Sequence, residues 1–335
     1  MEFIYYVGGL VGWNLSGKVS NSFTTGTVEG EQNVGGLVGS SNNGTVENSY
    51  ATGTVEGAQK VGGLVGSATN TQISDAYATG NVVATVDAAS SIGGLVGVLN
   101  NSRIEQSYAT GSVTTGFRPF DVGGLVGYAL NQSVISQSYA DTSVTVGNAQ
   151  SDWMSGEIGG LVGYLNNSRI EESYAVGSVT TGDYLFSVGG LVGYVYLPNT
   201  DAITNSYANV SVTTGEGVFD VGGLVGLIED AGVTNSYSIG AVSAGAGSTD
   251  VGGLFGNSSN TDVTSSFWDT ETSGQETSAG GTGKTTAQMY DTANYAGWDM
   301  ASWSLFEGRG AVVEGYEVGE GLPYLTNVTR EQDRV

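Results

Sequence analysis

Small and apolar residues occupy alternate positions in short stretches that recur along the chain. In ESYAVGSVTTG, residues 172–182, Ser173, Ala175 and Val179 mark one face, and Tyr174 begins the other. A period of two is typical of β-strands. The hexad VGGLVG at 188–193 is expected to alternate in the same way, with its valines and its leucine on opposite faces.

This hexad is the centre of a repeat. Nine copies of [VI]GGL[VF]G follow one another at spacings of 27, 27, 31, 30, 36, 30, 33 and 30 residues. A recurrence of roughly 20 to 50 residues is typical of solenoids, propellers and other arrays. The copies begin at Val7, Val34, Val61, Ile92, Val122, Ile158, Val188, Val221 and Val251.

A second block, of the type NSYATG, follows each hexad at a nearly constant distance. Its aromatic residue is expected to form one ladder along the array. An exposed ladder would suit sugar rings, but the favoured interpretation is a packed or covered wall, because every unit repeats it. The ladder consists of Phe23, Tyr50, Tyr77, Tyr108, Tyr139, Tyr174, Tyr207, Tyr237 and Phe267.

Each unit supplies about three short strands separated by Asn/Ser/Gly or Thr/Gly turns. A four-stranded propeller blade of roughly 40 to 45 residues fits this length poorly. The sequence therefore predicts an all-β fold, a parallel β-helix or β-solenoid of about nine to ten coils, which is roughly 45 to 50 Å long at the usual strand spacing. Paired glycines are expected at tight corners, or where a Cβ would block close packing.

The hexad is lost near the C-terminus. We predict solenoid repeats over residues 1–267 and a capping segment over 268–335, with a short helix at Thr285–Tyr290. A cap is needed because the last coil would otherwise expose strand edges and core. SAGGTGKT, residues 278–285, imitates a phosphate-binding loop, but Ser278 replaces the first glycine and no βαβ pattern surrounds it. We interpret it as a turn of the cap and predict no cofactor.

VGGLVG followed by SYATGSV resembles the GLUG-motif repeat family, which occurs in bacterial and archaeal cell-surface and adhesin-like proteins. The resemblance covers residues 7 to about 270, and SFWDTETSGQ with the later GWD and LPYL resembles the segment that often closes such arrays. The resemblance implies a surface scaffold and names neither a ligand nor a reaction, because scaffold residues define the family.

The amino-acid composition excludes several classes of partner and site. The chain has 33 acidic and 9 basic residues, a net charge of −24, and no histidine or cysteine. We expect no nucleic-acid partner and no membrane insertion, because phosphates repel this charge and no long apolar run is present. The acidic surface also suits a halophilic source. Missing histidine and cysteine remove common general bases and nucleophiles, so we predict no catalytic residue. The acids match no common calcium motif, and we predict no metal site.

Functional residues are expected where the units differ. Longer turns precede the hexads at Val122, Ile158, Val188 and Val221, and they carry aromatic residues beside acidic ones. Stacked on one edge, they would form an exposed strip for a ligand. Alternatively, these side chains fold back over the hydrophobic edge. The predicted ligand-binding residues are Phe120, Trp153, Tyr184, Phe186 and Phe219.

The leading hypothesis is a non-enzymatic extracellular adhesin or fibre module, a rigid spacer whose lateral turns bind a surface glycan or protein. Self-association is compatible with it. The start MEFIYYVGGL lacks the basic region and cleavage site of a signal peptide. We therefore also consider a virion tail-fibre or spike subunit at the virion surface. A polysaccharide-cleaving β-helix enzyme is the third hypothesis.

Overall fold

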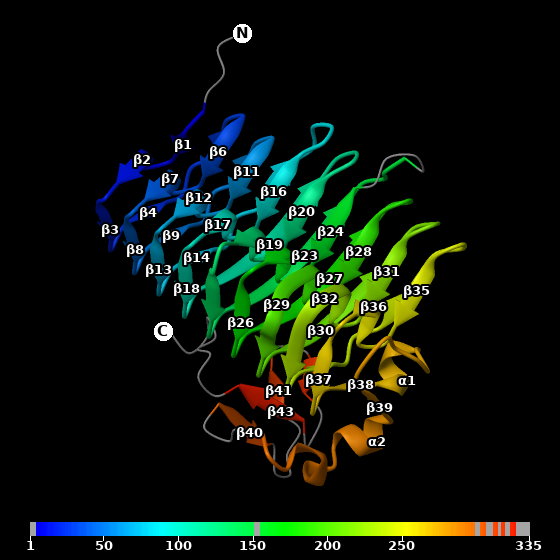
Figure 1. Cartoon of the computed structure of the whole chain (residues 1–335). Helices are drawn as coiled ribbons and strands as arrows, with labels where there is room; N and C mark the ends of the chain where they lie inside the picture. Colours follow the sequence, from blue (N-terminus) through cyan, green and yellow to red (C-terminus); the bar gives the residue numbers. More distant parts are fainter. Residues whose placement is uncertain are drawn as a thin grey trace.

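The chain folds into three parallel β-sheets that run along one elongated solenoid of about nine turns (Figure 1). The structure is a computed structural model that describes residues 5–150, 155–298, 302–305, 311–313, 316–318 and 322–325. In that part of the chain, strands dominate and helices are few and short. The predicted all-β solenoid is confirmed.

The first sheet contains the strand that ends in the first two hexad residues. Its nine strands pair in sequence order, each with its counterpart in the next coil. In order they are β1 (Val7–Gly8), β6 (Gln32–Gly35), β11 (Gln59–Gly62), β16 (Ser90–Gly93), β20 (Phe120–Gly123), β24 (Gly156–Gly159), β28 (Phe186–Gly189), β31 (Phe219–Gly222) and β35 (Thr249–Gly252).

The second sheet begins with the last two hexad residues and holds two successive strands from most coils. The first row is β2 (Val11–Leu15), β7 (Val38–Asn42), β12 (Val65–Thr69), β17 (Val96–Asn100), β21 (Val126–Leu130), β25 (Val162–Asn166), β29 (Val192–Thr204), β32 (Val225–Thr234) and β36 (Phe255–Ser259). The second row, which β29 and β32 also join, is β3 (Lys18–Ser20), β8 (Thr45–Glu47), β13 (Gln72–Ser74), β18 (Arg103–Glu105), β22 (Val134–Ser136), β26 (Arg169–Glu171) and β37 (Asp262–Thr264).

The third sheet carries the aromatic ladder. Its path is β4 (Phe23–Thr24), β9 (Tyr50–Ala51), β14 (Tyr77–Ala78), β19 (Tyr108–Thr115), β23 (Tyr139–Val146), β27 (Tyr174–Thr181), β30 (Tyr207–Thr213), β33 (Tyr237–Ser238), β38 (Phe267–Asp269) and β39 (Thr282–Lys284). Beside this path lie β5 (Val28–Glu29), β10 (Val55–Glu56), β15 (Val82–Ala84) and β34 (Val242–Ser243).

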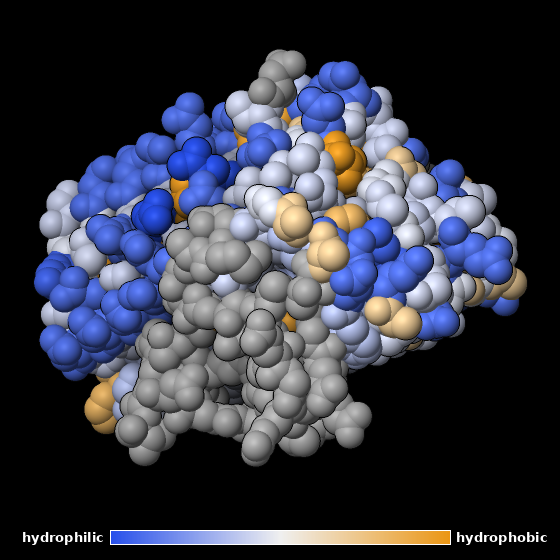
Figure 2. Space-filling model, turned by 90° about the horizontal axis from the view of Figure 1, so that it is seen from below, coloured by the Kyte–Doolittle hydropathy of each residue, from blue (hydrophilic) through white to orange (hydrophobic). Residues whose placement is uncertain are grey.

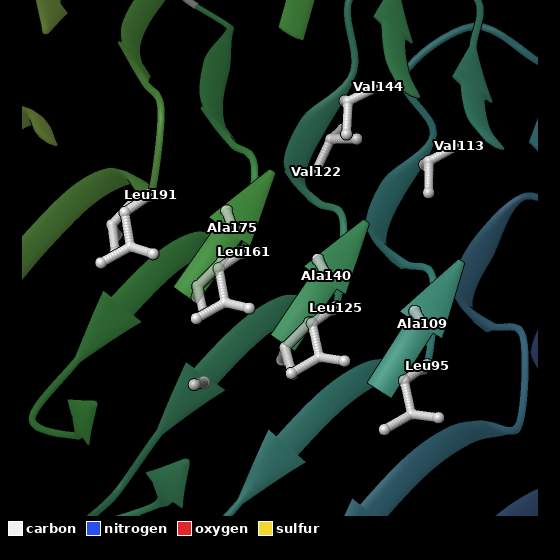
Figure 3. Packing of buried hydrophobic residues seen from close by; sticks show 14 of the residues in the cluster. Leu95, Ala109, Val113, Val122, Leu125, Ala140, Val144, Leu161, Ala175 and Leu191 are labelled. Atoms are coloured by element: carbon white, nitrogen blue, oxygen red, sulfur yellow. The ribbon is translucent and has the colours of Figure 1, made fainter. Parts of the chain in front are cut away.

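The core is built of identical positions stacked in columns. Figure 3 shows the hexad leucines of four successive coils, with the alanines of the third sheet opposite them. Leu95, Leu125, Leu161 and Leu191 are fully buried. Because each apolar side chain rests on its equivalent one coil away, the hydrophobic gain of folding comes from coil-on-coil burial.

The expected alternation within the hexad is wrong. Val188, Leu191 and Val192 are all fully buried, although alternation would place the leucine on the outer face. The reason is a corner, because β28 ends at Gly189 and β29 begins at Val192. A Cβ on Gly190 would lie 2.1 Å from the carbonyl oxygen of Gly223 in the next coil, so the predicted close packing at the glycines is confirmed.

Left-handed backbone marks the corners. The first residue of the NSYATG block has φ between 45° and 50° in nine coils, which explains its Asn, Asp or Gln character in most of them. The serine that follows is a buried link between coils. Ser173 Oγ accepts a hydrogen bond from Ser138 N at 3.2 Å and donates one to Glu171 O at 2.8 Å. The geometry of the scaffold therefore explains why the first two residues of the NSYATG block recur in the repeat.

The C-terminal segment covers the last coil (Figure 1). Gly253 N donates to Thr277 O, and Ala279 N donates to Phe255 O. The predicted helix is confirmed as α2 (Thr286–Met289), with a capping box between Thr285 and Gln288. The other cap elements are α1 (Thr270–Ser273), a 3₁₀ turn (Thr292–Tyr295), and the antiparallel pairs β40 (Trp303–Leu305) with β43 (Pro323–Leu325) and β41 (Ala311–Val313) with β42 (Tyr316–Val318).

Among the described strands, none pairs with the outer edge of the first coil, so we call this the open end. Leu10 is 52% exposed, whereas its equivalent in the second coil, Leu37, is fully buried. Trp13 and Leu15 on β2 and Phe23 on β4 are also more than half exposed. Within the described residues the two ends of the rod therefore differ. The first coil presents apolar surface, whereas at the last coil the cap packs on the core and β39 continues the third sheet.

Candidate functional site

Three of the predicted ligand-binding residues occupy one column of the first sheet. The strand register joins Phe120 to Gly156, Gly156 to Phe186, and Phe186 to Phe219. Phe219 is 46% exposed, and the other two rings are half-buried. A Cβ on Gly156 would lie 2.0 Å from Phe186 O, so this column is interrupted by a position where no side chain fits. We call these four residues the phenylalanine column.

The other two predicted residues lie apart from this column. Tyr184 precedes β28 in a turn, has φ of 59° and is 42% exposed. Its ring lies over Gly217, where a Cβ would come within 2.8 Å of Tyr184 Cδ1. Trp153 lies outside the described residues. The structure thus brings together Phe120, Phe186 and Phe219 but does not test whether they bind a ligand.

The next residue in each coil forms a second column, which we call the corner column. Asp121, Glu157, Ser187 and Asp220 follow the phenylalanine-column residues in four successive coils, and their φ angles lie between 52° and 61°. Left-handed backbone at this position is a structural requirement of every described coil from the second onward. This backbone conformation does not require the carboxyl groups that three of the four residues carry.

Sequence reasoning missed a second tyrosine ladder. Tyr128, Tyr164 and Tyr194 follow the hexad directly in three successive coils, and their rings stack in parallel at centroid distances of 5.0 and 4.7 Å. The recurring VGGLVGY was visible in the sequence. Because only three successive units carry tyrosine directly after the hexad, this local departure from the repeat could have revealed the ladder. We call these three residues the corner ladder.

The corner column and the corner ladder meet across a tight inside corner between the first and second sheets. The last hexad glycine comes so close to the preceding coil that a Cβ on Gly163 would lie 2.5 Å from Val122 N. A side chain at the next position, Asn257, donates from Nδ2 to Asp220 Oδ1 at 3.0 Å. By the same repeat geometry Tyr164 lies beside Asp121.

The carboxyl groups at this corner hold their protons unusually tightly. Burial raises the pKa of Asp121 to about 6, even though Ser91 Oγ donates to its Oδ2 at 3.2 Å. Burial, followed by the negative charge of Asp121, raises the pKa of Glu157 to about 8. Burial also raises the pKa of Asp220. Around neutral pH this corner therefore presents a protonated carboxyl group as well as carboxylates.

Hydroxyl groups complete the corner. Burial is the main cause of raised pKa values at Tyr128, Tyr164 and Tyr194, so these phenols stay neutral. Asn166 Nδ2 donates to Tyr128 Oη at 3.2 Å, and Tyr194 Oη hydrogen-bonds Glu229. Ser187 Oγ is fully buried and finds no partner within the described part of the chain. The corner thus offers a ligand hydrogen-bond donors and acceptors rather than a strong electrostatic field.

No group of three or more acidic residues suited to a metal ion occurs among the residues described. Asp121 and Glu157 are neighbours, but Ser187 takes the next position of the column. Oxygen-rich sites for calcium need more ligands than two carboxyl groups supply.

The main aromatic ladder forms as predicted. From Phe23 to Tyr237 successive rings stack at 4.7 to 5.1 Å. Tyr237 is 2% exposed, because Trp298 and Trp303 of the cap pack against it and its Oη donates to Pro323 O at 2.8 Å. The favoured interpretation of a packed and covered wall holds for the later coils, whereas Phe23 at the open end is exposed.

The GLUG motif matches residues 4–29, 30–56, 57–83, 88–114 and 154–180. These five units are GLUG motifs. They cover five hexads, so the family defines the same repeat as the solenoid coil. No curated protein and no solved structure was found to match the chain. None of the helices in the described ranges has the length and apolarity needed to cross a bilayer.

Proposed function

We propose that this protein is a stiff extracellular spacer that binds a surface glycan or protein along the lateral edge of its middle coils. Its GLUG units and its β-solenoid fit a repeat-type structural protein. The phenylalanine column carries the proposal, because its three rings lie in register within four successive coils and Phe219 is nearly half exposed. Aromatic rings beside polar groups are a frequent basis of recognition.

Display outside the cell, on a cell or virion surface, is the second part of this proposal. The net charge of −24 keeps a rod soluble and suits a saline exterior, where salt screens its self-repulsion. In Figure 2, hydrophilic residues cover most of the coloured surface, and apolar residues are scattered. Such a surface supports a spacer that stays dissolved while one lateral strip makes contact.

The binding role is tested by replacing two rings. Phe186→Ala with Phe219→Ala should lower binding in a glycan and cell-surface screen by at least about tenfold, the equivalent of roughly 1.4 kcal/mol. Phe23→Ala is the matched control, because Phe23 is also exposed but lies at the open end. Equal binding by the double variant and the wild type, with unchanged thermal unfolding, would remove the proposed strip.

Glycan cleavage is a second candidate because Asp121 and Glu157 are neighbours on successive coils. Glycosidases use two carboxyl groups, one of them protonated, on either side of the scissile bond. We favour binding without cleavage, since both carboxyl groups project from one column rather than from facing walls. Incubation with a panel of polysaccharides tests this choice. New reducing ends that disappear in Asp121→Asn or Glu157→Gln would establish the enzyme instead.

A further inference from the structure

Two shallow hollows lie side by side on the turns between the two rows of the second sheet. They measure about 440 and 470 Å³. Three residues, Asn70, Asn101 and Gln132, line both. We call the joined hollows the amide groove. Its first hollow is lined by Thr69, Asn70, Asn100, Asn101, Asn131, Gln132 and Asn167.

One extra residue in the fifth coil distinguishes its turn from those of the fourth and sixth coils. The register pairs Val96 with Val126 and Ile104 with Ile135, so the turn of the fifth coil is one residue longer than that of the fourth. Both Asn131 and Gln132 adopt left-handed backbone there, where neighbouring coils use a single such residue. The amide groove therefore lies at a break in the repeat.

Amide side chains form two short hydrogen-bonded ladders in the groove. Asn101 Nδ2 donates to Asn70 Oδ1 at 2.7 Å, and Asn131 Nδ2 donates to Asn100 Oδ1 at 2.9 Å. Each primary amide has two N–H donors and an oxygen with two lone pairs. One ladder bond on each side leaves further donors and acceptors free to face solvent, because Asn70, Asn101 and Asn131 are exposed.

The backbone does not require all of these amides. Left-handed φ accounts for asparagine at Asn70, Asn101 and Asn167. Asn100 ends the extended strand β17, and Thr69 ends β12, so neither has that constraint. The groove therefore contains more amide side chains than the left-handed backbone of its turns explains.

The chemistry of the groove points to an uncharged ligand. Its first hollow is lined by amides and one hydroxyl, and the second adds Arg103, whose Nε lies 3.3 Å from Glu105 Oε2. An anionic chain would be repelled by the net charge of −24, and a cation would prefer the carboxylates elsewhere. Hydroxyl groups both donate and accept, as amides do.

We propose that the amide groove binds an uncharged glycan chain that runs along the rod axis. This inference adds a second binding surface to the proposed function, because the groove lies on the second sheet and the phenylalanine column on the first. Coils rise by about 4.8 Å, so each coil of the groove offers one or two amides to roughly one sugar ring of an extended chain. Ladder bonds hold the amides in place before the glycan arrives, which reduces the ordering cost of binding.

The test removes amides without disturbing the corner. Asn70→Gly with Asn101→Gly keeps left-handed backbone accessible but deletes both side chains. Cello-, manno- and chito-oligosaccharides serve as neutral probes, and polygalacturonate is the charged comparison. We expect the wild type to bind at least one neutral probe and the double variant to bind it at least tenfold more weakly. Asn43→Gly, one coil outside the groove on the same ladder, should bind as the wild type does.

The outcomes separate this inference from the proposed function. If the phenylalanine-column variant loses binding while the Asn70/Asn101 variant retains it, the binding function stands and the amide groove is refuted. Preference for polygalacturonate over every neutral probe would also refute it. Loss of neutral binding in the Asn70/Asn101 variant, with the Asn43 variant intact, supports the groove.

Discussion

Asp121 and Glu157 occupy the same position of successive coils, so that the charge of one raises the pKa of the other. Burial is the larger cause for both. Because folding raises the two pKa values from 3.8 and 4.5 to about 6 and about 8, the folded state binds more protons than the unfolded state across that interval.

The free energy of unfolding should therefore fall as pH rises. The contribution of the two carboxyl groups is complete below pH 4 and is lost by about pH 8. We expect Asp121→Asn with Glu157→Gln to remove this dependence and to be more stable than the wild type at pH 8, by on the order of 2 kcal/mol. Urea unfolding at pH 5 and pH 8 measures both effects. The same fall with pH in the double variant would contradict the assignment.

The last glycine of the hexad should tolerate no side chain. We expect Gly163→Ala to lower the free energy of unfolding by about 3 kcal/mol or more, because its Cβ would meet the backbone of the preceding coil at 2.5 Å. Gly26→Ala is the control, since no atom lies within 4 Å of its added Cβ. It should change stability by less than about 1 kcal/mol. Chemical denaturation of both variants provides the comparison, and equal losses would argue against close packing as the cause.

Self-association should depend on the open first coil. Trp13 and Leu15 are 57% and 60% exposed on β2, which among the described strands pairs with β7 on one side only. We expect sedimentation velocity to show concentration-dependent association that Trp13→Ser with Leu15→Ser weakens at least about tenfold, or roughly 1.4 kcal/mol. Tyr184→Ser, an exposed aromatic residue in the middle coils, should leave association unchanged. A wild type that stays monomeric at every concentration would disprove the expectation.

Docking of the cap should depend on Trp303. The indole is 1% exposed, lies against Tyr207 and Tyr237, and donates from Nε1 to Asn205 Oδ1 at 3.2 Å. Trp303→Ala should weaken docking by about 3 to 5 kcal/mol. Hydrogen exchange would then accelerate in α2 while the second and third coils keep their protection. Uniform acceleration across the chain would mean that the cap and the solenoid unfold as one unit.

The periodicity of the sequence was sufficient to predict the coil and its core, but it did not predict the backbone direction at the corners. The hexad spacing predicted which valines and leucines stack, because each coil must place the same residue over its equivalent. Alternation failed between Gly189 and Val192, where the chain turns and two successive residues, Leu191 and Val192, point inward. A period of two holds only within one strand.

The candidate site was predicted in part for the same reason. Phe120, Phe186 and Phe219 share a column because they stand two residues before their hexads. The closeness of Tyr164 to Asp121, whose charge contributes to the raised pKa of Tyr164, was not foreseen. It depends on two sheets meeting at a corner, and that angle leaves no pattern in the sequence. The amide groove depends on the single extra residue in the turn of the fifth coil. The repeat spacing shows that a residue has been inserted, but it does not show that a groove results.

The unequal ends give the rod a mechanical direction. Strands bond to equivalent strands in adjacent coils, so tension applied along the axis at the open end loads one coil interface at a time. Among the described coils, the first bonds to a neighbour on one side alone and should separate first, whereas Trp298, Trp303 and the strand β39 also hold the last coil. A tether attached at the capped end would therefore withstand more force than one attached at the open end.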